Sequence, residues 1–198
     1  MDKYGVGQDP YCYDGTNVFR NLLEIRDDAI LQEAERELTT IAADGIPFSL
    51  PPYDFDYLKS LHRQLFRDLY PWAGEIRAID ISKGDTRFCH CDRIEPEAKK
   101  LFAQLVRADW YTGLERDELI VAAAEFYGDL NVLHPFRDGN GRAQRILFEH
   151  LIINCGYEIS WAGLDRDEWI RANIAAYYCD YDLMVAVFRQ CIGAPLAE

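Results

Sequence analysis

The chain of 198 residues has no apolar run as long as a membrane span and no basic segment followed by an apolar leader. It also has no internal repeat, no low-complexity stretch and no linker long enough to separate two folding units. These absences predict a single domain over residues 1–198, located in the cytoplasm. A chain of this length can bury roughly 70% of the surface that it exposes when unfolded, so it can build its own core.

Closely spaced cysteines are few, and basic residues are in the minority. The six cysteines include one close group, Cys89-His90-Cys91, whose spacing is not that of a zinc finger. We therefore expect reduced thiols rather than disulfides or a metal site. The chain has 21 lysines and arginines against 34 aspartates and glutamates, a net charge of −13. This balance argues against nucleic acid as a direct partner, because nucleic acids are bound by basic surfaces.

One segment, His134–Arg145, concentrates the residue types that nucleotide chemistry needs, and it reads HPFRDGNGRAQR. Its three arginines and one aspartate give it a local charge of +2 within an acidic chain, which suits an anionic nucleotide. The segment is not a P-loop, because the pattern GxxxxGK[ST] occurs nowhere in the sequence.

Each part of this segment has a chemical role open to it. His134 can accept a proton near neutral pH. Asp138 offers the hard oxygen ligand that Mg²⁺ takes together with phosphate oxygens. Gly139–Gly141 can form a turn whose N–H groups hold a phosphate at the start of a helix. Arg142 and Arg145 share one face of that helix and suit phosphate oxygens. Taken singly, Asp138 could be a capping residue and the arginines could pair with carboxylates; their clustering favours the phosphate role.

The segment resembles the signature of the Fic family, HxFx(D/E)GNGRxxR, and agrees with it at every defined position. The resemblance extends on both sides and covers most of the chain. It includes PYCYDGTNVFRN at Pro10–Asn21, PWAGEIR at Pro71–Arg77, KGDTRF at Lys83–Phe88 and NVLHPF at Asn131–Phe136. The whole chain is similar to the short bacterial Fic toxins of toxin–antitoxin pairs.

This resemblance implies an all-α Fic fold, a helical bundle with a small β-hairpin flap beside a motif loop that joins two central helices. It implies a protein adenylyltransferase that transfers AMP from ATP to a hydroxyl side chain of a target protein. His134 would be the general base and Asp138 the ligand of Mg²⁺. Family members that transfer a γ-phosphate carry lysine at the place of Gly141. The implied nucleotide-binding residues are Gly139, Asn140, Gly141, Arg142 and Arg145, with possible flap contacts from Lys83, Gly84 and Thr86.

The resemblance also implies a mode of regulation. Many Fic proteins are inhibited by a helix with the pattern (S/T)xxxE(G/N), whose glutamate pairs with the arginine that corresponds to Arg145. The sequence contains no such pattern, so we expect a separate small antitoxin to supply it. The expected targets are DNA gyrase and topoisomerase IV, as for known toxins of this subgroup. Two alternatives stay open: a catalytically silent interaction module, and a Fic-fold transferase that moves phosphocholine, UMP or phosphate.

Apolar periodicity and capping residues predict the secondary structure. We expect a loop at Ile46–Pro52 and a β-hairpin from Glu75 to Phe88. Among the remaining histidines, we expect His62 at the surface and His150 in the core. The predicted helices are Val18–Ile25, Asp27–Ala42 with Asp27 as cap, Phe55–Leu69, Pro96–Trp110, Leu119–Leu133 with Asp117 as cap, Arg142–Asn154, Trp169–Tyr178 opened by Asp165 and Glu168, and Asp182–Cys191.

Overall fold

The structure is a computed structural model, and it describes residues 9–84 and 86–197. These residues are mostly helical, which confirms the all-α prediction. In the described ranges, no helix is both long enough and apolar enough to span a membrane. The helices are α1 Asp28–Asp44, α2 Phe55–Phe66, α3 Ile94–Arg107, α4 Arg116–Leu133, α5 Asn140–Asn154, α6 Arg166–Tyr177 and α7 Asp182–Cys191. Two small antiparallel pairs accompany them, β1 Ser82–Lys83 with β2 Thr86–Arg87, and β3 Tyr157–Ile159 with β4 Ile192–Pro195.

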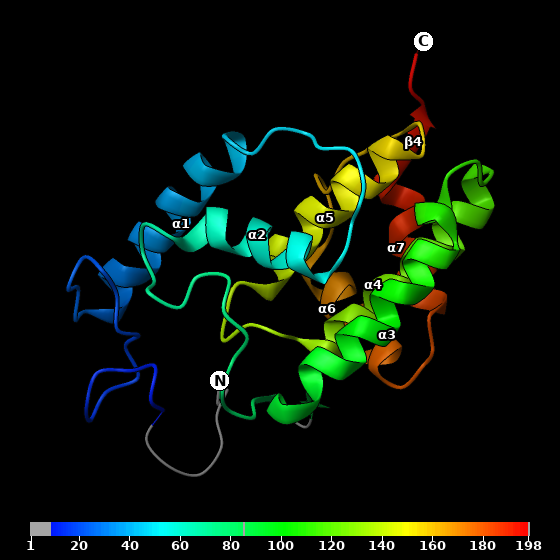
Figure 1. Cartoon of the computed structure of the whole chain (residues 1–198). Helices are drawn as coiled ribbons and strands as arrows, with labels where there is room; N and C mark the ends of the chain where they lie inside the picture. The colour runs from blue at the N-terminus through cyan, green and yellow to red at the C-terminus, as the bar shows by residue number, and fades with distance from the viewer. Residues whose placement is uncertain (1–8, 85, 198) are drawn as a thin grey trace.

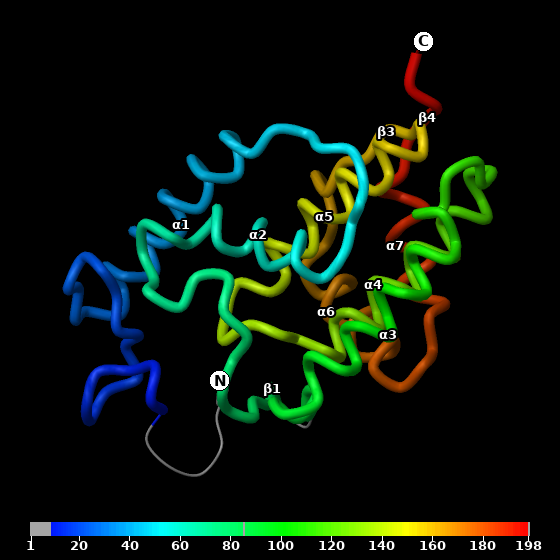
Figure 2. Tube along the Cα trace, viewed as in Figure 1, coloured from blue at the N-terminus to red at the C-terminus, as the bar shows by residue number. Residues whose placement is uncertain are grey.

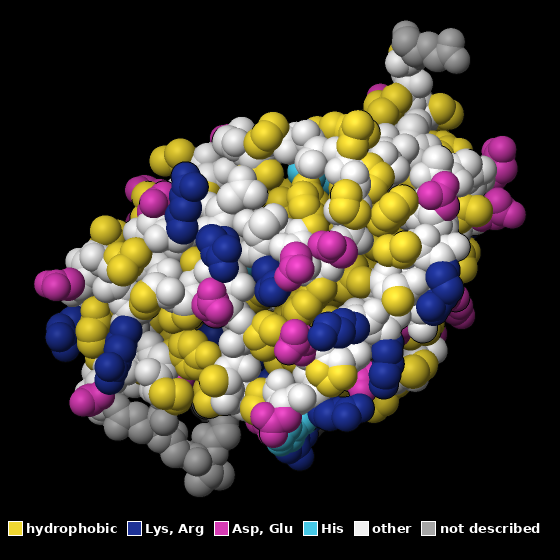
Figure 3. Space-filling view, in the orientation of Figure 1, with side chains coloured by type: hydrophobic (Ala, Val, Ile, Leu, Met, Phe, Trp, Pro, Cys, Tyr) yellow, Lys and Arg dark blue, Asp and Glu magenta, His cyan; other side chains and the backbone are white. Residues whose placement is uncertain are grey.

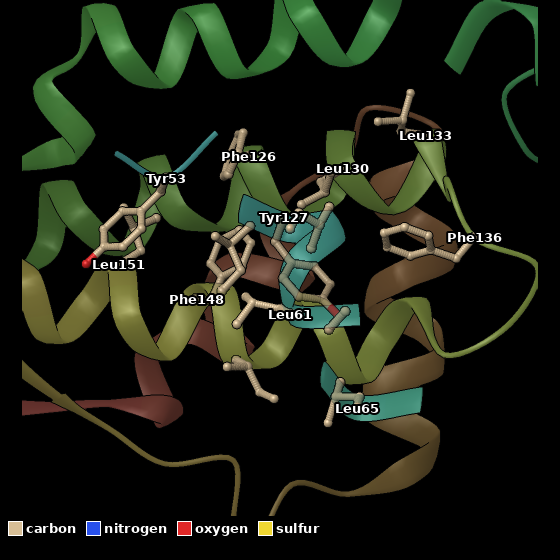
Figure 4. Packing of buried hydrophobic residues seen from close by; sticks show 14 of the residues in the cluster. Tyr53, Leu61, Leu65, Phe126, Tyr127, Leu130, Leu133, Phe136, Phe148 and Leu151 are labelled. Carbon is tan, nitrogen blue, oxygen red and sulfur yellow. The ribbon is translucent and has the colours of Figure 1, made fainter. Parts of the chain in front are cut away.

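Helices α4 and α5 form the centre of the molecule. In Figure 1, α1 and α2 lie on one side of α5, and α3 and α4 lie on the other. Helices α6 and α7 pack against α4. Figure 4 shows Tyr127 and Leu130 of α4 in one buried cluster with Phe148 of α5 and Leu61 of α2. The loop that joins α4 to α5 therefore starts and ends on well-packed helices, which gives it a rigid seat.

Most helix starts are at the capping residues that the sequence indicates. The side chain of Asp27 accepts the N–H of Ile30 at the start of α1, and Asp165 accepts the N–H of Glu168 at the start of α6. The prediction of Asp117 as a cap was wrong. Glu115 is the N-cap of α4 and forms a reciprocal capping box with Glu118, which satisfies two N–H groups at once.

Two local predictions need correction. Val18–Ile25 is not a helix, because the side chain of Asn21 bonds to the carbonyls of Phe19 and Ile25 and to the N–H of Ile25, in place of a helical ladder. The hairpin exists but is shorter than predicted, with two residues in each strand. In the segment before it, Arg77 donates its N–H to the carbonyl of Pro135 and Ala78 donates to the hydroxyl of Tyr11, so these groups do not pair with a strand.

Candidate active site

A cavity of about 520 Å³ lies between the motif loop, the hairpin and α6. Figure 2 shows β1 at the lower edge of the molecule, near the loop that joins α4 to α5. The fold thus brings together groups that are about fifty residues apart in sequence. Every predicted site residue lines this cavity: His134, Asp138, Gly139, Asn140, Gly141, Arg142, Arg145, Lys83, Gly84 and Thr86.

His134 ends α4 in a left-handed conformation, with φ 44° and ψ 62°, which turns the chain sharply into the loop. Its Nδ1 lies 3.2 Å from the carbonyl oxygen of Asn131. A carbonyl only accepts, so Nδ1 carries the proton of the neutral ring and Nε2 carries the lone pair. The ring stacks on Phe88, with centroids 3.8 Å apart and planes 15° apart. The tautomer and the ring plane are therefore both set by the fold.

The loop after His134 is braced from within. The side-chain oxygen of Asn140 accepts the N–H of Phe136 at 2.9 Å, and its amide donates to the carbonyl of Phe136 at 2.9 Å. Gly139 has φ +75°, and a Cβ there would lie 2.3 Å from the ring of Phe66, so no other residue fits. Asp138 accepts the N–H of Gly139 at 2.7 Å. The side chain of Asn140 therefore holds the loop together, and its backbone N–H stays available to a ligand.

Helix α5 begins directly at this loop. Its N-cap is Gly139, and Ala143 and Arg142 already donate to the carbonyl of Gly139. The helix geometry leaves the N–H groups of Asn140 and Gly141 without an intrahelical acceptor. A Cβ added at Gly141 would meet nothing within 4 Å. The positive end of the α5 dipole and two N–H groups therefore face a space that can hold a phosphate.

The two motif arginines have different surroundings. Arg142 donates to Thr39 at 3.2 Å and to Glu35 at 2.5 Å, both on α1, and lies over the ring of Phe66. It pairs with a carboxylate while still lining the cavity. Arg145 lines this cavity and also a second one of about 530 Å³ between α1 and α5. Arg145 can therefore be reached from two sides.

Arg77 connects the hairpin to the motif, although the sequence pattern assigns it no separate role. Its buried guanidinium donates to the carbonyl of His134 at 2.9 Å and to that of Ile79 at 2.6 Å, and it also donates to the carbonyl of Cys89. Ile79 precedes β1 and Cys89 follows β2, so one side chain holds both ends of the hairpin and the end of α4. The only signal in the sequence is its place in PWAGEIR.

His62 was predicted at the surface, and this was wrong: it is completely buried. It lies among Leu58, Leu61 and Leu65 on the apolar face of α2. Its Nδ1 accepts the N–H of Gly74 at 2.8 Å, and its Nε2 donates to the carbonyl of Asp138 at 2.9 Å. Burial lowers its pKa to about 4, so the ring is neutral near pH 7 and supports the loop by hydrogen bonding.

One other prediction about a single group is confirmed. His150 is buried in the core, where burial lowers its pKa and the hydroxyl of Tyr57 contacts its Nδ1. All six cysteines carry free thiols.

A residue left without a role, Arg137, is buried and pairs with Asp9 through its Nε at 2.9 Å, which ties the described start of the chain to the motif loop.

Apolar side chains of α4, α6 and the residue after α6 also line the cavity, and the sequence gave no sign of this. They are Tyr127, Trp169, Ile170, Ile174 and Tyr178. An aromatic and aliphatic wall beside a polar loop has the composition of a site that holds a flat ring as well as an anion.

Comparison with known proteins agrees with this geometry. The model of the Fic/DOC family matches residues 52–152. The chain is 39% identical over 192 residues to the probable protein adenylyltransferase Fic of Escherichia coli (strain K12), covering 97% of this chain and 96% of that protein. It is also 39% identical over 192 residues to protein adenylyltransferase VbhT of Bartonella schoenbuchensis, covering 96% of this chain and 40% of that protein.

Solved structures extend the agreement to three dimensions. The chain is similar to BepC, a VirB-translocated effector protein of Bartonella tribocorum solved with bound AMPPNP, with a TM-score of 0.86, 27% identity and coverage of 94% of this chain and 97% of that one. It is also similar to the N-terminal Fic domain of a putative cell filamentation protein of Bartonella quintana solved with bound ADP, with a TM-score of 0.84, 28% identity and coverage of 94% and 95%. Both of those proteins hold an adenine nucleotide.

Proposed function

Because the chain belongs to the Fic/DOC family and its relatives over nearly its whole length are protein adenylyltransferases, we propose a reaction for its cavity. The enzyme is a nucleotidyltransferase that takes ATP as co-substrate. AMP passes from ATP to a hydroxyl side chain of a target protein. The observation that carries the proposal is the meeting of the His134 ring, the Gly139–Gly141 loop and the β1–β2 hairpin around one cavity.

His134 acts as the general base. Its Nδ1–H is held by the carbonyl of Asn131, so Nε2 is the atom that takes the proton of the attacking hydroxyl. The hydroxyl oxygen forms a bond to the α-phosphorus, and the bond from that phosphorus to the oxygen bridging to the β-phosphate breaks. Pyrophosphate leaves. The stack on Phe88 and the bond from Arg77 to the His134 carbonyl keep the ring from turning away.

The phosphates lie on the N-terminus of α5. The N–H groups of Asn140 and Gly141 and the helix dipole stabilise negative charge that develops on the α-phosphate. Arg145 holds the outgoing phosphates together with Arg142, whose guanidinium Glu35 fixes in place. The apolar side chains that line the cavity then accept the adenine ring.

The donor set near Asp138 fits Mg²⁺. A carboxylate that lines the cavity beside a phosphate cradle offers the hard oxygen that this ion prefers, with phosphate oxygens and water completing the shell. Bound there, Mg²⁺ supplies charge neutralisation at the phosphate oxygens. The bond that Asp138 accepts from Gly139 holds the carboxylate in position.

The hairpin presents the target. Lys83 and Arg87 are exposed, and in the described residues β1 and β2 pair with no further strand, although the carbonyl of Arg87 accepts the hydroxyl of Tyr177 at 3.0 Å. An extended target segment can add to an edge of this pair through main-chain hydrogen bonds, largely without regard to its sequence. Lys83, Gly84 and Thr86 line the cavity, so they also contact the nucleotide.

The second cavity supports a regulatory partner. It is lined by Thr39 and Thr40 of α1 and reaches both Arg142 and Arg145. A small antitoxin with the pattern (S/T)xxxE(G/N) would place its glutamate on Arg145 through this opening and compete with the nucleotide. This assignment makes the chain the toxin of a toxin–antitoxin pair, acting in the cytoplasm on DNA gyrase or topoisomerase IV.

Labelled nucleotides separate this reaction from its alternatives. The purified chain is incubated with a bacterial lysate and with ATP labelled at either the α- or the γ-phosphorus. We expect label on protein from α-labelled ATP only. Label from γ-labelled ATP alone would mean phosphate transfer, and transfer from UTP or a phosphocholine donor instead of ATP would mean another donor. Nucleotide binding without any transfer would indicate a silent module.

A further inference from the structure

Three side chains with metal-binding atoms meet at the base of the hairpin. Asp80 lies just before β1, and His90 and Cys91 follow β2. Their ligand atoms all lie within 4.8 Å of one another. The Nε2 of His90 is 3.1 Å from Oδ2 of Asp80. From the sequence we expected no metal site at Cys89-His90-Cys91; the third ligand, Asp80, lies at the other end of the hairpin, and only the fold brings it close.

The chemistry of the three atoms is that of a zinc site. Imidazole nitrogen, thiolate sulfur and carboxylate oxygen are the ligands that Zn²⁺ binds tetrahedrally, at about 2.0–2.3 Å. Tetrahedral geometry then places ligand atoms about 3.3–3.8 Å from one another. The His90–Asp80 separation is already close to this, and the remaining pairs need to approach by about 1.5 Å at most. Exposed side chains make shifts of that size by rotamer adjustment.

Neighbouring groups orient these ligands. The N–H of Cys91 donates to Oδ1 of Asp80 at 2.8 Å, which directs Oδ2 toward His90. In the metal-free chain, Nδ1 of His90 accepts the backbone N–H of Asp92 at 3.4 Å. An ion on Nε2 requires the other tautomer, whose Nδ1–H would face Oδ2 of Asp92, 3.7 Å away. Carboxylates that orient a metal-bound histidine in this way are a regular part of zinc sites.

The arginine that an ion would displace from Oδ2 of Asp80 is held weakly. Arg87 approaches Asp80 at 3.4 Å, but its side chain is 71% exposed, so an ion that replaced this pair would displace little. The His90 side chain is 50% exposed, which leaves an open path for an ion. Figure 3 shows histidine atoms at the lower rim of the molecule, between basic and acidic side chains. Burial and the nearby Asp80 raise the pKa of the Cys91 thiol, so binding must release its proton.

We propose that Asp80, His90 and Cys91 bind one Zn²⁺ ion, with the fourth position open to water, and that this ion clamps the base of the hairpin. The site is separate from Asp138. A thiolate and an imidazole select a softer ion than Mg²⁺, whereas the carboxylate beside the phosphate loop selects Mg²⁺. A bound ion would join Asp80 to His90 and Cys91 and so reinforce the link that Arg77 makes between Ile79 and Cys89.

Cobalt provides a direct test on the full chain, because a Co²⁺ ion bound by a thiolate has a charge-transfer absorption band that water-bound Co²⁺ lacks. Metal-free protein is titrated with Co²⁺ and then with Zn²⁺. We expect the band to saturate at one equivalent of Co²⁺, to disappear when Zn²⁺ displaces the cobalt, and to persist in a large excess of Mg²⁺. A wild-type chain without the band would overturn the proposal.

Substitutions identify the ligands. Cys91→Ser should abolish the band, and Asp80→Asn and His90→Ala should each weaken Zn²⁺ binding at least tenfold. Cys89→Ser is the matched control, because Cys89 is adjacent in sequence but not part of the cluster, and it should keep the band. Circular dichroism checks that each variant is folded. A band that survives in Cys91→Ser, or an Asp80→Asn variant with unchanged affinity, would contradict the assignment. The readout is independent of AMP transfer, so the two proposals can fail separately.

Discussion

Phe88 lies flat against His134, with ring centroids 3.8 Å apart. This contact joins the end of β2 to the end of α4, so the hairpin that would present the target also positions the base. Arg77 reinforces the same junction from the other side, through the His134 carbonyl. Target presentation and proton transfer therefore depend on one structural unit, and most of the predictions below probe that unit.

His134→Ala should lower the rate of AMP transfer by about 10²–10⁴, the usual loss when a positioned base is removed. ATP should still bind, because the α5 N-terminus and both motif arginines remain. Single-turnover transfer and equilibrium ATP binding measure the two quantities. Transfer at the parent rate would show that His134 is not the base, and loss of ATP binding would show that its role is structural.

Asp138→Asn keeps the shape of the side chain and its bond to the Gly139 N–H, but removes the charge. Transfer should fall sharply, and half-maximal activity should require more Mg²⁺ than in the parent chain. A Mg²⁺ titration of both proteins checks this. Asp167→Asn, at an exposed position in the first turn of α6, is the control and should leave the titration unchanged. Full activity in saturating chelator would rule out the metal-assisted scheme.

Arg77→Lys keeps the charge but cannot reach three carbonyls at once. We expect faster hydrogen exchange at the N–H of Phe88, which donates to the carbonyl of Ile81 in the hairpin. The transfer rate should fall by about tenfold or more, because a loosened hairpin and His134 lose their alignment. Arg87→Lys makes the same change on an exposed side chain of β2 and should have a much smaller effect. Equal effects of the two substitutions would show that the Arg77 bonds do not position the site.

Local chemical patterns allowed the motif loop and the long helices to be predicted from sequence. Capping at Asp27 and Asp165 depends on neighbours within three residues, and the phosphate loop depends on adjacent glycines, so each is visible in a short window. The same applies to α7, whose bounds were predicted as Asp182–Cys191. Most features that form within one turn of the chain were therefore predictable, although the Glu115 capping box and the Asn21 bonds are also local and were missed.

Features made by distant segments were not. His62 looked like a surface residue beside Arg63, yet its two partners, Gly74 and Asp138, come from other parts of the chain. Arg77 and the Asp80, His90 and Cys91 cluster likewise depend on how the hairpin closes. Periodicity shows that a residue is on an apolar face, but not which carbonyl it will meet there.

His62 should make stability depend on pH. Its folded pKa of about 4 lies below the ordinary value of 6.5, so between these values the unfolded chain binds more protons. Stability is fully present above pH 6.5 and falls as the pH drops toward 4, by about 1.4 kcal/mol per pH unit from this group and up to about 3 kcal/mol in all. Urea unfolding at several pH values measures the slope. His62→Asn should reduce it, and an unchanged slope in this variant would show that His62 is not its source.

Arg145 should decide regulation. It lines both cavities, as Arg142 does, and the sequence contains no inhibitory glutamate that could pair with it. The chain expressed alone in bacteria should stop growth, and a small partner with (S/T)xxxE(G/N) should restore it. The partner's carboxylate and the ATP phosphates compete for one guanidinium, so replacing that glutamate by glutamine should restore toxicity while the complex stays intact.

Thr40→Tyr places a larger side chain in the second cavity and leaves the nucleotide cavity unchanged. It should weaken inhibition without lowering transfer by the free chain. The assignment as a toxin that is active without its partner would be contradicted if the purified chain bound Mg-ATP but modified no lysate protein, and if expression of the chain left growth unaffected.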